Sequence, residues 1–352
     1  MSTALHPLVV TDVRHDTTTS VVVTFAQPEA GAWRFTHGQF LTVQATIGGQ
    51  AVRRCYSLCS TAPNGPLTVG IRQIPSGLFS TWANHVLAPG DVVEALRPSG
   101  DFTHGLEPDH SREYLLVAGG SGITPLVAIA STILHHEPKS TVTLLYVNRT
   151  SSNTMLLDEV EALRNLFLGR FRIWYTFTGE TSDIDLLNGR PDADRLAQLV
   201  AAGMLPAKPD HGFVCGPEGL VGVVVEHLNR CGLNEKAIHT ELFNAATPAR
   251  DSPVETLSTG IVATAAILLN GRTTSVELAA TDTILDAMER DRPEVPWSCR
   301  RGICATCRAE ITDGEVTMAV SHGLSDEELA QGYVLTCQAV PTTDSVTVDY
   351  DA

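Results

Sequence analysis

Four cysteines near the C-terminus constrain the fold more than any other feature of the sequence. Cys299, Cys304 and Cys307 follow the spacing C-x4-C-x2-C, and Cys337 comes after 29 further residues. Three thiols within nine residues and a distant fourth form the ligand pattern of a plant-type [2Fe–2S] cluster. Structural zinc sites, the alternative alongside a disulfide pair, usually arrange their cysteines as two short hooks. The chain must therefore fold into a tight loop that brings four thiolates together.

The acidic charge of the chain is concentrated on the same end. The formal net charge is −16, and residues 254–352 contain 16 Asp or Glu against 6 Arg and no Lys. A chain this acidic is not expected to bind nucleic acid. The excess acid either steers a basic docking face on a redox partner or simply solvates the surface.

The other cysteines do not suggest a secreted protein. Cys55, Cys59, Cys215 and Cys231 have no spacing typical of a disulfide framework, and we expect them to be reduced. The first residues lack the apolar stretch of a signal peptide, and no apolar run approaches 18 residues. We therefore expect a cytoplasmic protein with no membrane association.

Hydrophobic periodicity divides the chain into a multidomain α+β arrangement. Residues 1–109 read as short alternating strands, which predicts an antiparallel β-barrel, and residues 110–245 alternate strand and helix, which predicts a doubly wound α/β domain. Residues 246–259 read as a linker. Residues 260–352 predict a β-grasp ferredoxin domain with a helix that begins at Thr281 or Asp282 and a short helix opened by a capping box at Ser325 and Glu328.

A glycine-rich turn follows the first strand of the α/β domain. The segment AGGSGITP contains Gly120, Gly122 and Thr124, and it leads from an apolar strand directly into a helix. Glycine lets the backbone approach a pyrophosphate, and the helix N-terminus attracts the negative charge. The turn therefore predicts a dinucleotide site, with an ordinary strand–helix turn as the alternative.

Two motifs in the barrel resemble the ferredoxin–NADP reductase superfamily. Arg54-Cys55-Tyr56-Ser57 is similar to its flavin motif R-x-Y-S, and Gly77-Leu78-Phe79-Ser80 to its second motif, G-x-x-S/T. The resemblance implies that Tyr56 packs on the FAD ring, Arg54 pairs with a phosphate, Ser57 bonds the ring, and the backbone around Leu78 with Ser80 meets the pyrophosphate. Taken alone, Tyr56 reads equally well as an ordinary strand aromatic and Arg54 as a surface charge.

The same resemblance assigns roles in the α/β domain. It places a nicotinamide dinucleotide at the glycine-rich turn, with Thr124 close to the contact between flavin and nicotinamide. Cys215-Gly216-Pro217 matches the superfamily's C-G-P, which makes Cys215 a residue on the hydride path. Glu241 and Phe243 lie at the end of the domain, where the chains of relatives return over the flavin. The resemblance implies that these two residues contact the flavin or take part in proton handling.

The choice of coenzyme depends on the end of the second α/β strand. An acid there favours the free ribose 2′-hydroxyl of NADH, whereas Arg and Ser favour a 2′-phosphate. The sequence reads Arg149, Thr150, Ser151, Ser152, with no acid. We expect NADPH, bound through Arg149 and Ser151 or Ser152, with NADH as the alternative. The arginine and the serine would also fit a solvated loop that binds no coenzyme.

The order of flavin barrel, nicotinamide domain and ferredoxin resembles the reductase subunits of phenylacetyl-CoA epoxidases, and ketosteroid-hydroxylase reductases share it. The resemblance implies electron flow from NAD(P)H through FAD and the cluster to a multicomponent oxygenase, a di-iron epoxidase of phenylacetate catabolism. A nicotinamide gives two electrons and a [2Fe–2S] cluster accepts one, so the flavin must divide the pair. The alternatives are the reductase of a Rieske-type oxygenase, ketosteroid hydroxylase or fatty-acid desaturase, and, in another class, a ferredoxin-fused redox sensor.

Overall fold

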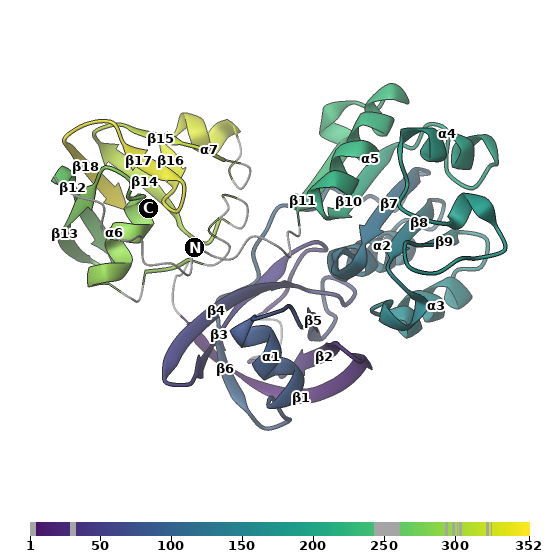
Figure 1. Ribbon diagram of the computed structural model, residues 1–352, viewed down its shortest axis with the longest axis horizontal. Coiled ribbons are helices and arrows are strands. Elements are labelled where there is room, and N and C mark those ends of the chain that lie inside the picture. The colour runs from purple at the N-terminus through teal and green to yellow at the C-terminus, as the bar shows by residue number, and fades with distance from the viewer. Residues whose placement is uncertain are drawn as a thin grey trace. The chain divides into compact units, whose positions relative to one another are not determined.

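The computed structural model describes residues 5–28, 33–242, 261–292, 295–297, 300, 302, 305–321, 324 and 326–352. The predicted linker 246–259, together with Phe243, Cys299 and Cys304, lies outside the described residues. The chain forms two compact units (Figure 1). The larger unit contains the α/β domain and the barrel apart from residues 53–55, which are grouped with the smaller unit and its C-terminal domain.

The first part of the larger unit is a six-stranded sheet in the order β4-β3-β6-β1-β2-β5. Its elements are β1 His6–Thr17, β2 Ser20–Phe25, β3 Phe40–Ile47, β4 Gln50–Ser57, β5 Leu67–Arg72, α1 Leu78–His85 and β6 Val92–Ala95. The pairs β1–β2, β1–β6, β2–β5 and β3–β6 are antiparallel. A bridge between Leu58, just after β4, and Val69 in β5 joins the two edge strands. The predicted antiparallel barrel is confirmed.

The second part is a five-stranded parallel sheet in the order β11-β10-β7-β8-β9. Its strands are β7 Glu113–Gly119, β8 Thr141–Asn148, β9 Phe171–Phe177, β10 His211–Gly216 and β11 Ile238–Leu242. Its α-helices are α2 Ile123–His136, α3 Leu157–Leu166, α4 Ala193–Ala201 and α5 Glu218–Arg230, and its 3₁₀ turns are η1 Gly120–Gly122, η2 Ser151–Asn153, η3 Asp185–Leu187 and η4 Glu235–Ala237. The strand order reverses between β7 and β10, and ligands of such sheets bind at the carboxyl ends beside that point.

Alternation along β7 explains why helices cover both faces of this sheet. Leu116 and Ala118 pack in one core with α2 and α3, whereas Leu115 and Val117 pack in another with α4 and α5. Val22 of β2 belongs to the α2–α3 core, although its neighbours Val21 and Val23 face the barrel interior. The barrel therefore contributes a side chain to one of the two hydrophobic cores of the α/β domain.

The smaller unit has a five-stranded mixed sheet, β13-β12-β18-β14-β16, and a two-stranded sheet, β15-β17. Its elements are β12 Ile261–Leu269, β13 Arg272–Ala279, α6 Ile284–Asp291, β14 Arg308–Asp313, β15 Val316–Met318, α7 Asp326–Ala330, β16 Tyr333–Leu335, β17 Ala339–Pro341 and β18 Ser345–Asp349. The hairpin β12–β13, the helix, and β18 running parallel to β12 give the predicted β-grasp outline.

One predicted helix start was wrong by one or two residues. The cap of α6 is Thr283, not Thr281 or Asp282, because Thr283 and Asp286 form a reciprocal capping box. Asp282 instead accepts the Ala279 N–H at 2.8 Å and pairs with Arg290. Two neighbouring residues that both favour capping made the sequence signal ambiguous.

A helix that spans a membrane needs about 20 predominantly apolar residues. Among the described residues, no helix is long and apolar enough to cross a membrane.

Candidate functional site

The carboxyl ends of β7 and β10 approach so closely that only glycine fits between them. A Cβ on Gly216 would lie 3.0 Å from the Gly119 Cα, and a Cβ on Gly122 would lie 2.2 Å from the Cys215 carbonyl oxygen. These glycines let the start of α2 pack directly against the end of β10. The structure therefore brings the predicted residues Gly120, Gly122 and Cys215-Gly216-Pro217 together at the point where the strand order reverses.

The N-terminus of α2 opens into the same place. Gly120 has φ +55°, a conformation suited to glycine, and no side chain among the described residues caps the helix at Gly122. Thr124 is buried, and its hydroxyl donates to the Ser121 carbonyl oxygen at 3.1 Å. A glycine turn without a capping side chain leaves the helix N-terminus as an anion site, so these residues fit a dinucleotide pyrophosphate.

Cys215 and Glu241 form a thiol–carboxyl pair on neighbouring strands. The Cys215 thiol lies 3.8 Å from the Glu241 Oε2, and the two residues are register partners of β10 and β11. Burial raises the pKa of Glu241 to about 8, although the residue as a whole stays partly exposed, and the thiol's hydrogen bond opposes that rise. Burial likewise raises the pKa of Cys215 well above its ordinary value, and the adjacent Glu241 raises it further. At neutral pH the thiol is therefore protonated and no nucleophile.

The predicted flavin residues of the barrel lie on β4 and at the start of α1. The Tyr56 and Phe79 rings are 5.5 Å apart, and Trp82 continues the contact at 5.4 Å from Phe79. Tyr56 is half-buried, and an aromatic ring at this place suits stacking on a planar group. Ser57 at the end of β4 is buried, and Arg54 Nη1 donates to the Arg53 carbonyl oxygen at 2.7 Å.

The second flavin motif lies at the N-terminus of α1. Gly77 caps the helix without a side-chain hydrogen bond, and Leu78 is 44% exposed. The buried Ser80 hydroxyl accepts the Ile74 N–H at 3.2 Å and lies 3.2 Å from the Gly77 carbonyl oxygen, to which it donates. Ser80 therefore holds the glycine turn in place, and a phosphate at this turn would meet backbone N–H groups first.

The segment Arg149–Leu156 after β8, here called the coenzyme loop, contains a carboxylate contact that the sequence did not reveal. Glu180, which follows β9, accepts the Ser151 N–H at 2.9 Å and the Ser151 hydroxyl at 3.2 Å. Arg149, Ser151 and Ser152 are exposed, and Ser152 Oγ lies 3.1 Å from Thr150 Oγ1. Glu180 therefore accepts from both donors of Ser151. This acid follows β9, whereas the sequence analysis looked for an acid at the end of β8.

Arg72 at the end of β5 is a second residue that the sequence reading missed. Its Nη2 donates to the Asn153 carbonyl oxygen at 2.6 Å, and a Cβ on Gly120 would lie 2.9 Å from its Nη1. Its Nε is buried and makes no hydrogen bond among the described residues. A barrel cation thus lies against the glycine turn, and its only sequence signal is a charged residue that ends an apolar strand.

The two described cluster cysteines, Cys307 and Cys337, are buried in the smaller unit and held close to each other. Thr336 connects them, because its N–H and its hydroxyl both donate to the Cys307 carbonyl oxygen, at 3.1 and 3.0 Å. The buried Tyr350 hydroxyl donates in turn to the Thr336 hydroxyl at 2.7 Å.

The loop before Cys307 turns sharply in the way that the thiol spacing requires. Arg300, Gly302 and Ala305 all have φ between +51° and +72°. The Arg300 guanidinium binds Asp286 at 3.0 Å and Glu289 of α6, and it lies 4.4 Å from the Trp297 ring centroid. Buried thiols and a backbone that curls around them fit a four-thiolate cluster.

No metal-holding group of three or more His, Cys, Asp or Glu occurs within the described ranges. The predicted ligands Cys299 and Cys304 lie outside those ranges, so the four-cysteine set stays a prediction.

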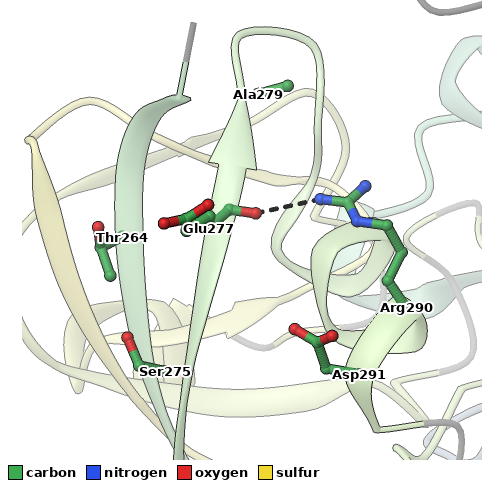
Figure 2. Close-up of a pocket in the computed structure, with 6 residues that line it drawn as sticks. All are labelled: Thr264, Ser275, Glu277, Ala279, Arg290 and Asp291. Atoms are coloured by element: carbon green, nitrogen blue, oxygen red, sulfur yellow. Dashed lines mark hydrogen bonds between the residues drawn. The ribbon is translucent and has the colours of Figure 1, made fainter.

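A groove of about 560 Å³ in the smaller unit is lined by Thr264, Ser275, Glu277, Ala279, Arg290 and Asp291. Figure 2 shows the Arg290 guanidinium directed from α6 at β13, where it donates to the Glu277 carbonyl oxygen at 3.1 Å. Neither Cys307 nor Cys337 lines the groove, so we assign it no part in the site.

Titratable groups also gather at the opposite, amino end of the parallel sheet. The rings of His104 and His211 stack with centroids 4.1 Å apart, those of Phe213 and His239 at 4.3 Å, and His211 Nδ1 lies 3.3 Å from His239 Nε2. Burial, first, and the neighbouring His211 and Arg112 lower the pKa of His104 to about 3. These rings therefore stay neutral at physiological pH.

A buried carboxylate completes this group at the amino end. Glu137 accepts hydrogen bonds from Tyr114, Ser140 and His110, at 2.8, 2.7 and 3.0 Å. Burial alone would raise the pKa of Glu137, but these bonds hold it below its ordinary value. Each donor is directed at the same two oxygens, so the carboxylate is fully used inside the protein.

Three families of domains match the chain in consecutive segments. Residues 8–104 match the oxidoreductase FAD-binding domain, residues 116–226 the oxidoreductase NAD-binding domain, and residues 267–342 the 2Fe-2S iron-sulfur cluster binding domain. These segments contain the flavin motifs, the glycine turn with the coenzyme loop, and the four cysteines.

Curated proteins resemble the chain along its whole length. It is 38% identical to one subunit of the 1,2-phenylacetyl-CoA epoxidase of Escherichia coli strain K12, covering 99% of both chains. It is 30% identical to the ferredoxin reductase component of 3-ketosteroid-9-alpha-monooxygenase from Rhodococcus rhodochrous, covering 97% of this chain and 96% of that one. Among solved structures, phthalate dioxygenase reductase has the same fold, with 22% identity, a TM-score of 0.61 and 98% of each chain covered.

Proposed function

The chain belongs to the family of oxygenase reductases that join an FAD-binding domain, an NAD-binding domain and a 2Fe-2S domain, and we propose that it passes electrons from NAD(P)H to a phenylacetyl-CoA epoxidase. The observation that carries the electron-transfer role is the meeting of the glycine turn, Cys215 and the barrel strand β5 at one edge of the parallel sheet. The specific oxygenase rests on the similarity to the Escherichia coli epoxidase protein.

Different residues of the larger unit would bind different parts of the coenzyme. The turn at Gly120 and Gly122 offers backbone N–H groups to the coenzyme pyrophosphate, and Arg72 adds a cation on the barrel side. Cys215 and Thr124 are buried, and both stand where water must be excluded from the reacting ring. A Cβ on Gly70 of β5 would lie 2.8 Å from the Thr124 Cγ2, so barrel and α/β domain close on each other at this place.

The flavin and the cluster have separate sets of residues. Tyr56, Ser57 and Arg54 with the Gly77–Ser80 turn would hold FAD, and Cys299, Cys304, Cys307 and Cys337 would hold the cluster. When bound, FAD takes two electrons from a nicotinamide and gives them up singly, and a [2Fe–2S] cluster carries one electron at a time. The protein's part is to orient the rings and to keep the thiolates buried.

The test of the proposal is coupled turnover. Purified holoprotein is mixed with the oxygenase components of a phenylacetyl-CoA epoxidase, and NADPH consumption and phenylacetyl-CoA loss are followed together. We expect both to depend on this chain and to proceed in a fixed ratio. NADPH consumption without loss of phenylacetyl-CoA, while ferricyanide is still reduced quickly, would contradict the partner but retain the electron-transfer function.

A second partner is favoured by the 30% identity to the ketosteroid monooxygenase reductase. The same assay with the oxygenase component of that system and a 3-ketosteroid distinguishes the two acceptors. The redox-sensor alternative predicts slow bleaching of the flavin by NADPH and no cytochrome c turnover. Rapid turnover of cytochrome c excludes it.

The coenzyme choice is open to a direct test at the coenzyme loop. Arg149 favours a 2′-phosphate, whereas Glu180 beside Ser151 favours a free 2′-hydroxyl. We keep NADPH as our prediction. Arg149→Ala is then expected to lower kcat/KM for NADPH about tenfold and to leave NADH unchanged; an equal loss with both coenzymes would remove Arg149 from the specificity site.

We also propose the domain boundaries 1–109, 110–245 and 260–352, with a linker at 246–259. Each family match falls within one of the three segments, which supports the division. The expected cytoplasmic location stays a prediction.

A further inference from the structure

The start of α3 is held by a carboxylate from the barrel. Asp16 of β1 accepts the Leu156 N–H with both oxygens, at 3.1 and 3.0 Å, across 140 residues of sequence. The Asp16 side chain is only 5% exposed, and Ser20 donates to its Oδ2 at 3.1 Å. Leu156 has φ +53°, which is uncommon for a residue other than glycine. Asp16 therefore fixes an unusual backbone conformation at the last residue of the coenzyme loop.

Other side chains hold the rest of the coenzyme loop. Arg72 of the barrel donates to the Asn153 carbonyl oxygen at 2.6 Å, and Glu180 accepts from Ser151 at 2.9 and 3.2 Å. The buried Tyr146 hydroxyl lies 3.0 Å from the Met155 carbonyl oxygen and 3.1 Å from that of Gly120. The loop is thus tied to the glycine turn by Tyr146 and to the flavin barrel by Asp16 and Arg72.

This arrangement has a functional meaning if the loop reads the coenzyme. The loop follows the second strand of a doubly wound sheet, where such domains contact the adenosine ribose. The barrel carries the flavin motifs. A carboxylate that belongs to the barrel but fixes this loop therefore sets where the adenosine end of the coenzyme lies relative to the flavin.

We propose that Asp16 is a positioning residue for coenzyme binding, acting through the Leu156 N–H on the loop that carries Arg149. The inference rests on the proposed function, because it requires NAD(P)H to bind at this edge. A loop that must be ordered by the coenzyme itself binds it more weakly, because part of the binding free energy is used for ordering. The contact serves the bound substrate and the transition state alike, so it affects KM and not kcat.

The experiment measures both constants for NADPH and NADH in the holoprotein, with ferricyanide as electron acceptor. Asp16→Ala is expected to raise KM about tenfold for both coenzymes, the size of one charge-assisted hydrogen bond, and to leave kcat within about twofold. The fragments 2′,5′-ADP and ADP-ribose, titrated calorimetrically, are expected to lose affinity by the same factor. Asp16→Asn keeps an acceptor oxygen and is expected to recover most of the affinity.

The matched control removes a different contact between the same two domains. Thr61 of the barrel lies 2.6 Å, oxygen to oxygen, from Ser131 of α2, far along the chain from the coenzyme loop. Thr61→Val is expected to leave KM and fragment affinity unchanged. An equal rise in KM for Thr61→Val, or a fall in kcat with constant KM for Asp16→Ala, would overturn the proposal and reduce Asp16 to a stabilising contact.

If Asp16→Ala does not fold, Asp16→Glu decides the matter, because its longer side chain carries the carboxylate away from the Leu156 N–H. An unchanged KM and fragment affinity in a well-folded Asp16→Glu then count against the proposal. Failure of the proposed function looks different. In that case the wild-type protein neither reduces ferricyanide with NAD(P)H nor binds either fragment.

Discussion

The two ends of the parallel sheet both collect titratable residues, yet they differ in what those residues bond to. At the amino end, His104, His211 and Glu137 bond and stack on one another, and every oxygen of Glu137 has donors from within the protein. At the carboxyl end, Cys215 and Glu241 meet at 3.8 Å beside a turn made of glycine. At both ends burial strongly shifts the pKa of a side chain, that of His104 at the amino end and that of Glu241 at the carboxyl end.

The difference teaches that a shifted pKa does not by itself mark a site of chemistry. Burial shifts the pKa of His104 and of Glu241 alike, but only the carboxyl end adds glycines that admit another molecule's phosphates. The amino end is a structural network, and its residues are expected to affect stability alone. Variants at the two ends can test this division.

The largest effect is expected at the amino end. Glu137→Ala leaves Tyr114, Ser140 and His110 buried without their common acceptor, which should cost about 3–5 kcal/mol of stability. We expect a large fall in the thermal unfolding temperature by circular dichroism and no change in KM for NADPH. A change in KM at unaltered stability would break the comparison.

At the carboxyl end, Gly122→Ala should act on turnover. The added Cβ would lie 2.2 Å from the Cys215 carbonyl oxygen and must push β10 away from α2. A misplacement of this size is expected to lower kcat/KM for NADPH about 100-fold. Gly219→Ala in α5 is the matched control, because nothing described lies within 4 Å of its Cβ; equal losses in both would mean that the effect is one of folding.

Acid should weaken the amino end first. The pKa of His104 is about 3 and that of His239 about 4, both mainly through burial, against 6.5 in the unfolded chain. The unfolded state therefore binds more protons below pH 6.5, and stability falls as pH drops from 6.5 toward 4, by up to about 1.4 kcal/mol per pH unit for each histidine. His104→Gln should flatten this loss in urea titrations at pH 7, 6 and 5. An unchanged slope would assign the loss to carboxylates.

The smallest effect is expected from the carboxyl end's own acid. The pKa of Glu241 is about 8, above its unfolded value, so this group favours the folded state below about pH 4.5, and that contribution is lost as pH rises to 8. Glu241→Gln resembles the protonated form and should change kcat/KM less than about threefold at pH 7. It should also remove an inflection near pH 8 from the rate profile. A profile that keeps its inflection would place that titration elsewhere.

Much of this molecule could be predicted because its signals are local. The glycine turn and Cys215-Gly216-Pro217 each follow an apolar strand, and the topology then brings them together. Asp16, Arg72 and Glu180 could not be found this way. Each acts on a loop far away in sequence or one strand away, and nothing in their own neighbourhood distinguishes them from surface charges. The prediction of the α6 cap was wrong for the opposite reason, because several adjacent residues are of types that favour the N-cap position.

The barrel side chain that packs in the α/β core limits how this protein can be recombined. Val22 packs with α2 and α3, and Asp16 accepts the N–H of Leu156 at the start of α3. A cut between residues 109 and 110 therefore removes part of the interior of the α/β domain. Exchanging the barrel for that of a relative would succeed only if the incoming domain brought an acid at position 16 and an apolar residue at position 22. Two domains that read as separable modules in the sequence therefore exchange more safely as one piece than singly.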